Sequence, residues 1–220
     1  MTRCYAVFCG TLLAAASVWA GTPLVSYTAT TANVSGAPDT IRIDILRWST
    51  DAERDKLMDA WMLKTANAGR GGEGRGGRGR AGRGGGEASA APKPTPEAML
   101  AKALQQATTL GYLWSREVSG YAIRYAGKFA NADGSERIVL ITQRRLGAVN
   151  DLWKPAAGEE PAYDFSVIEL RVKANGDGEG KISLNGKVAP DGALNMIALE
   201  NYDALPVVFS HVQQRKGAEQ

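Results

Sequence analysis

The residues best suited to contact a ligand lie in the connection 150–163, which reads NDLWKPAAGEEPAY. Trp153 and Tyr163 stand there among polar residues, and Asp151 precedes the tryptophan by two positions. An aromatic ring beside hydrogen-bonding groups forms the flat apolar platform that carbohydrate and peptide sites use. We therefore predict Trp153, Tyr163 and Asp151 as possible ligand contacts. Alternatively, the same tryptophan would plug the open end of a sheet, and the sequence leaves both interpretations open.

Two other patterns resemble metal sites but have simpler explanations. Asp51, Asp55 and Asp59 recur every four residues and would follow one helix face, which is typical of a solvated surface as well as of a cation site. The segment 175–180 (NGDGEG) has the alternating ligands of an EF-hand loop, but Gly186 stands where a bidentate glutamate is required. A hairpin turn is expected there instead. We predict no catalytic residue, no metal ligand and no cofactor.

His211 is the only histidine of the chain. It shares strand parity with Val207 and Phe209, so we expect it to pack against the core or to form a hydrogen bond. An imidazole can act as a general base, but none of the sequence motifs that accompany a serine nucleophile is present.

The segment 69–86 is a tract of arginine and glycine, GRGGEGRGGRGRAGRGGG. It has no apolar residue larger than alanine, so we predict a disordered linker over 67–95. Arg-Gly repeats also bind nucleic acids through charge and stacking, but this tract lacks interleaved aromatic residues. Nucleic acid is therefore not expected as a partner, and weak polyanion binding through the tract stays an alternative.

The first twenty residues have the pattern of a secretory signal peptide. Arg3 supplies a positive charge, residues 5–18 are almost uncharged, and Ala20 offers a small residue for cleavage. We therefore expect a periplasmic or extracellular protein. Cys4 and Cys9 both lie in this segment, so the mature chain would fold without disulfides. No later apolar run approaches the ~18 residues that a membrane-spanning helix requires.

The net charge of +3 is unevenly distributed. Without Arg3 it falls to +2, and six basic and two acidic residues place +4 of it in 67–95. The remaining part therefore carries −2, so the basic character belongs to one segment. A hydrophobic content of 44% and a charged content of 22% are typical of a globular domain.

Two amphipathic helices are expected to flank the Arg/Gly tract. Thr50 and Glu53 form a capping-box pattern that opens a helix running to about Lys64. Thr95 and Pro96 supply the start of a second helix, which we expect to end before Gly111. The tract would then be the expanded loop of a helical hairpin.

The rest of the chain alternates between polar and apolar residues, as strands do. The strands are expected at 25–34, 40–48, 121–129, 138–142, 165–173, 180–188, 194–200 and 206–212. The segment 138–142 is apolar on both faces, which indicates a central strand. We predict an α+β, mainly β fold: an antiparallel sandwich or barrel-like sheet of about seven or eight strands with two helices. It would form a single domain over 21–216, interrupted by the linker.

Several segments resemble a family of secreted bacterial proteins of unassigned function. The resemblance rests on WSTDAERD at 48–55, ERIVL at 136–140, YDFSVIELRVK at 163–173, GEGK at 178–181 and IALENYDALPV at 197–207. It implies a single secreted β-rich domain and transfers no catalytic residue.

The function expected first is a non-enzymatic module that binds a ligand or partner in the envelope or outside the cell. One alternative is a hydrolase that uses two converging carboxylates, and the other is the weak polyanion binding described above. A closed core filled by side chains would favour an interaction through the surface.

Overall fold

The computed structural model describes residues 22–63, 93–115, 120–148, 152–156, 163–184 and 186–216. The predicted signal peptide and most of the predicted linker 67–95 lie outside the described residues, and so does Asp151.

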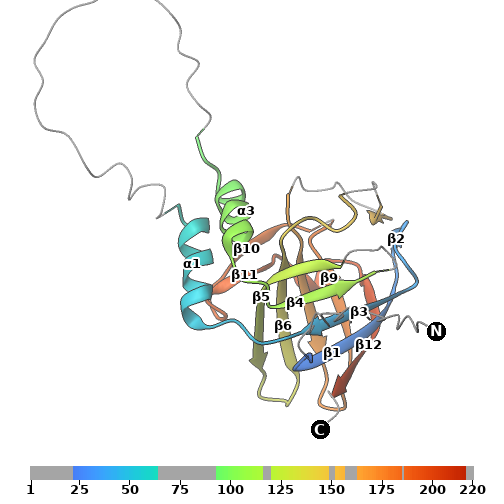
Figure 1. Ribbon diagram of the computed structural model, residues 1–220. Coiled ribbons are helices and arrows are strands. Elements are labelled where there is room, and N and C mark those ends of the chain that lie inside the picture. The colour runs from blue at the N-terminus through green and yellow to red at the C-terminus, as the bar shows by residue number, and fades with distance from the viewer. Residues whose placement is uncertain are drawn as a thin grey trace, which may run out of the picture.

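Eight strands form a closed antiparallel barrel in the order β1-β3-β4-β5-β6-β8-β9-β12 (Figure 1). Each strand pairs with the next barrel strand along the chain, and β12 closes the barrel on β1. The barrel strands are β1 (Val25–Thr31), β3 (Thr40–Ile45), β4 (Gly111–Trp114), β5 (Tyr121–Ala130), β6 (Glu136–Thr142), β8 (Val167–Val172), β9 (Asp177–Ile182) and β12 (Phe209–Lys216). The predicted mainly β fold with two helices is confirmed, and its sheet is a barrel.

Two small ladders lie outside the barrel. One pairs β2 (Val34–Ser35) with β7 (Lys154–Pro155), and the other is the hairpin of β10 (Val188–Asp191) and β11 (Met196–Leu199). A 3-10 helix, η1 (Tyr202–Ala204), follows the hairpin. The connection of β8 to β9 includes only the first two residues of the turn predicted at 175–180, Asn175 and Gly176, where Gly176 has a φ of 88°. Residues 177–180 already belong to strand β9.

Side chains fill the described interior of the barrel. Alternate residues of each strand point inward, as Val25, Tyr27 and Ala29 do on β1, where each is at most 6% exposed. Trp153 and Phe209 meet edge to face inside this cluster, with ring centroids 6.1 Å apart. An eight-stranded barrel is just wide enough for its own side chains or for one small ligand, and here the side chains take the space.

Strand β6 is buried on both faces, as its continuous apolar run predicts. Ile138 and Leu140 point into the barrel cluster. Val139 and Ile141 point the other way, into a second cluster between the barrel, the helices and the β10–β11 hairpin.

The two helices, α1 (Asp51–Trp61) and α3 (Pro96–Gln106), pack side by side against one side of the barrel (Figure 1). The predicted capping box of α1 is present, since Glu53 N–H donates to Thr50 Oγ1 and Thr50 N–H donates to Glu53 Oε2. Leu57 and Leu100 are buried at 3% and 0% exposure between the helices and the barrel. No described helix is long and apolar enough to cross a membrane.

A cluster of charged residues joins the β10–β11 hairpin to the barrel wall. Arg137 on β6 donates two hydrogen bonds to Glu169 on β8, at 2.6 and 2.9 Å, and a third to Asp191 at 2.8 Å. The Glu169 side chain has no exposed surface. A buried charge needs a partner, and Arg137 is the residue that links Glu169 on the barrel wall to Asp191 on the hairpin.

Candidate functional site

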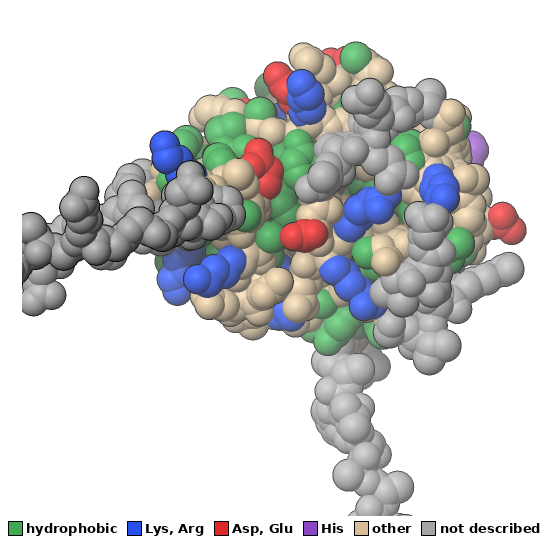
Figure 2. Space-filling model, turned by 90° about the horizontal axis from the view of Figure 1, so that it is seen from above, with side chains coloured by type: hydrophobic (Ala, Val, Ile, Leu, Met, Phe, Trp, Pro, Cys, Tyr) green, Lys and Arg blue, Asp and Glu red, His purple; other side chains and the backbone are tan. Residues whose placement is uncertain are grey.

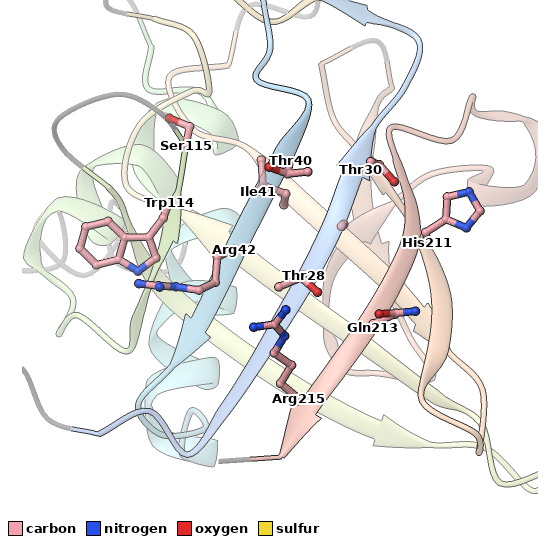
Figure 3. A pocket seen from close by; sticks show the side chains of 11 residues that line it. Thr28, Thr30, Thr40, Ile41, Arg42, Trp114, Ser115, His211, Gln213 and Arg215 are labelled. Atoms are coloured by element: carbon pink, nitrogen blue, oxygen red, sulfur yellow. The ribbon is translucent and has the colours of Figure 1, made fainter. Parts of the chain in front are cut away.

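The barrel wall formed by β12, β1, β3 and β4 is not covered by either described helix or by the hairpin (Figure 1). We call it the open wall. A shallow hollow of about 600 Å³ lies on it (Figure 3), and its lining comes from all four strands. The outward side chains that line it are Thr28, Thr30, Thr40, Arg42, Trp114, Ser115, His211, Gln213 and Arg215.

Strand register brings these residues into rows across the wall. Thr28 on β1 pairs with Arg42 on β3 and with Gln213 on β12, and Arg42 pairs in turn with Trp114 on β4. Neighbouring strands lie about 4.8 Å apart, so the row from Gln213 to Trp114 spans about 14 Å. The hollow is therefore long enough for an extended ligand rather than for a single small ion.

One end of the row is a rigid cluster around Asp44. Its carboxylate accepts hydrogen bonds from Trp114 Nε1 at 2.7 Å, from Arg42 Nε at 3.0 Å and from Ser26 Oγ at 2.7 Å. The Arg42 guanidinium lies 5.7 Å from the centre of the Trp114 ring, and its side chain remains 55% exposed. Asp44 thus orients an arginine that still presents donors to solvent.

The other end carries donors that have no partner among the described residues. His211, Gln213 and Arg215 are exposed, and no described residue forms a side-chain hydrogen bond or ion pair with them. Figure 3 shows Arg215 extending toward Thr28 and His211 projecting from the far side of β12. The outward row of β12 therefore offers a guanidinium, an amide and an imidazole to a ligand.

His211 is exposed rather than packed, so the expectation from strand parity is wrong. Thr28 and Thr30 on β1 are two positions apart, but their partners on β12, Gln213 and Ser210, are three positions apart. Strand β12 therefore has one extra residue between these pairs. The extra residue of this β-bulge shifts the alternation, because Phe209 and Val212 both face inward.

The chain matches no protein-family model, no curated protein and no solved structure. Its function must be inferred from its own residues. The resemblance to a family of secreted bacterial proteins stays a prediction.

Of the predicted ligand contacts of 150–163, neither Trp153 nor Tyr163 lines the hollow of the open wall. Trp153 is 0% exposed inside the barrel cluster. Tyr163 is half-buried and stacks on Phe165 with ring centroids 5.4 Å apart, while its hydroxyl accepts from Val188 N–H at 3.3 Å. Asp151 lies outside the described residues. A contact role for the three stays a prediction.

The α1–α3 groove and the buried Glu169 carry charged groups that internal contacts already hold. A groove between α1 and α3 is lined by Arg124, which donates to Ala107 O at 2.6 Å, and by Glu53, which binds Arg47 at 2.7 Å. The buried Glu169 is held by Arg137. Among the described residues, no three His, Cys, Asp or Glu side chains gather as metal ligands would. The predicted hydrolase alternative stays untested.

The end of the molecule seen from above carries side chains of mixed kinds. Figure 2 shows basic, acidic and hydrophobic side chains interspersed there. This mixture favours no one ligand class at that end, whereas the open wall combines free donors with one extended hollow.

Sequence reasoning missed the open wall because its residues occupy ordinary outward positions of strands. Arg42 and Arg215 are 173 positions apart in the printed sequence, and only barrel closure places both strands beside β1. The one available signal was a polar, hydroxyl-rich outer face on 26–30 (SYTAT).

Proposed function

We propose that this protein is a secreted or periplasmic, non-enzymatic binding module that holds an acidic polysaccharide on its open wall. The observation that carries the proposal is the extended hollow with Arg42 on one side and Arg215 on the other, bordered on β12 by donors that have no partner among the described residues (Figure 3). The location follows from the predicted signal peptide.

The filled barrel supports binding on the outside. Tyr27, Tyr121 and Phe209 occupy the interior with exposures of 1%, 0% and 0%. A ligand inside would have to displace such side chains, at a cost of several kcal/mol for each large residue removed from the core. The outer hollow requires no such rearrangement.

The chemistry of the hollow fits a sugar polymer that carries carboxylates. Guanidinium groups bind carboxylates through charge-assisted hydrogen bonds, and Arg42 and Arg215 provide two of them. Thr28 and Gln213 provide neutral donors and acceptors suited to sugar hydroxyls. A span of about 14 Å suits several linked sugars.

The first prediction concerns Arg215→Gln, because the Arg215 side chain forms no hydrogen bond or ion pair with a described residue. We expect the affinity for immobilised polygalacturonate to fall roughly fivefold, since an exposed ion pair contributes up to about 1 kcal/mol. Arg42→Gln combined with it should reduce affinity further. Immobilised dextran, a neutral polysaccharide, is the control for binding that does not depend on charge. Thermal unfolding checks that each variant is folded.

The matched control removes two charges from the helices: Lys56→Gln with Lys102→Gln, both exposed beside the α1–α3 groove. We expect this variant to retain the wild-type affinity. A third arm deletes 69–86. If that deletion abolishes retention while the open-wall variants bind normally, the Arg/Gly tract is the polyanion site and the proposal is wrong.

A further inference from the structure

The β-bulge of β12 has a strained backbone at His211. His211 has a φ of 50°, in the left-handed region that residues other than glycine rarely adopt. Both neighbouring strands are affected, since Phe209 and Val212 on β12 oppose Gly180 and Gly178 on β9. A bulge of this kind redirects a side chain, and strained residues concentrate at functional sites.

The redirected imidazole stands where two hollows of the surface meet. His211 and Gln213 line the hollow of the open wall and also a second hollow of about 520 Å³ over β8 and β9. Its outward neighbours on β12 are Ser210, which donates to Thr30 O at 3.3 Å, and Gln213, which forms no side-chain hydrogen bond with a described residue. A ligand that follows the row of the open wall would therefore reach the imidazole at its β12 end.

The charged groups around the imidazole are of both signs. On the side of β9 and the second hollow they are Asp133, Arg171, Lys173, Asp177 and Glu179, and on the side of the open wall they are Arg42, Asp44 and Arg215. Asp44 is neutralised by Arg42, so the excess on the open wall is positive. The groups on the β9 side sum to −1, so the imidazole lies between a positive and a negative region of the surface.

We infer that His211 is a further binding residue of the open wall, which holds the acidic polysaccharide more tightly as the pH falls. The inference rests on the proposed function. Histidine is the side chain that gains its charge between pH 8 and pH 5. Protonation adds a third cationic donor to Arg42 and Arg215, so the ligand gains one more charge-assisted contact.

The test compares the wild-type protein with His211→Asn on immobilised polygalacturonate, at constant ionic strength, from about pH 8 to about pH 5.5. Asparagine tolerates the left-handed backbone but does not titrate, and equal thermal stability of the two proteins checks that the bulge is preserved. We expect wild-type affinity to rise about threefold over this range, as one exposed ion pair allows. The affinity of His211→Asn should stay flat.

The outcomes separate the two proposals. Equal rises in both proteins would overturn the role of His211 and leave the open wall as the site. A rise that disappears in Glu179→Gln but persists in Arg215→Gln would also overturn it, because the pH dependence would then come from the β9 side. If the wild-type protein fails to bind polygalacturonate at every pH, the proposed function itself is wrong and this inference falls with it.

Discussion

Three buried polar atoms among the described residues lack a hydrogen-bond partner: the hydroxyls of Tyr27 and Tyr202 and the Nε1 of Trp153. Burial raises the pKa of Tyr27 above its ordinary value. An unsatisfied buried group costs about 1–3 kcal/mol, so these atoms weaken a barrel that its apolar packing stabilises. Tyr202 is partly compensated because Arg171 and Lys181 lie over its ring, at 3.7 and 4.4 Å from the centroid.

Replacing Tyr27 in the barrel interior by phenylalanine removes one of these unpartnered hydroxyls. In Tyr27→Phe we expect the free energy of unfolding to stay unchanged or to rise by up to about 1 kcal/mol, since the ring remains and only the unpartnered hydroxyl is lost. Urea denaturation of the purified protein measures the change.

Tyr121→Phe is the matched control inside the same barrel. Its hydroxyl accepts a hydrogen bond from Gly147 N–H at 3.0 Å, so its removal should destabilise the protein by about 1 kcal/mol. If Tyr27→Phe destabilises the barrel as much as Tyr121→Phe does, the Tyr27 hydroxyl has a partner such as a bound water.

At the scale of elements, the start of α1 depends on one carboxylate. The Arg47 guanidinium, together with the Thr50 backbone and side chain, lowers the pKa of Glu53 to about 2. Because the folded-state pKa lies below the ordinary value of 4.5, the ionised form is favoured by folding. This stabilisation is fully present above pH 4.5 and disappears as the pH falls toward 2.

We therefore expect Glu53→Gln to lower the free energy of unfolding by about 1 kcal/mol at neutral pH, as the loss of a helix cap does. The difference from wild type should shrink between about pH 4.5 and pH 2, and urea denaturation across that range measures it. Glu97→Gln is the control, since Glu97 lies in the first turn of α3 but its cap is formed by Thr95 alone. A constant difference at all pH values would contradict the role of the charge.

Local patterns were sufficient to predict most elements but not their limits. The apolar run 138–142 could only be a central strand, and the capping box marked α1 correctly. Strand β4 was missed because its four residues directly follow a helix and a short connection. The predicted strand at 180–188 begins three residues late, because glycines at 176, 178 and 180 hide the alternation of β9.

The candidate site was beyond sequence reasoning for a different reason. Alternation says which residues of a strand share a face, but it does not say which strands are neighbours. The pairing of β1 with β12 joins residues about as far apart as the chain allows. The bulge at His211 then reverses the parity of one strand through a single extra residue, and no composition signal marks it.

At the scale of the whole molecule, the buried ion pair of Arg137 and Glu169 on the barrel wall is linked to the β10–β11 hairpin through Asp191. The Glu169 side chain has no exposed surface, and the Arg137 side chain is 18% exposed. Replacing Glu169 leaves Arg137 with Asp191 as its remaining partner, and removing one member of a buried ion pair is strongly destabilising.

We expect Glu169→Gln to lower the free energy of unfolding by about 3 kcal/mol. Urea denaturation measures this change, and hydrogen exchange should rise first in the amides of 188–199. The control is Asp203→Asn, which breaks the exposed ion pair of Asp203 with Arg171 and should change stability little. Similar losses in both variants would show that the hairpin does not depend on the buried pair.

The ladder that closes the barrel joins Val25 to Lys216. During synthesis Val25 is made long before Lys216, so the barrel cannot close until β12 has left the ribosome. Contacts between such distant residues also make folding slow relative to a helical protein of the same size. The barrel therefore closes only after almost the whole described chain has been synthesised.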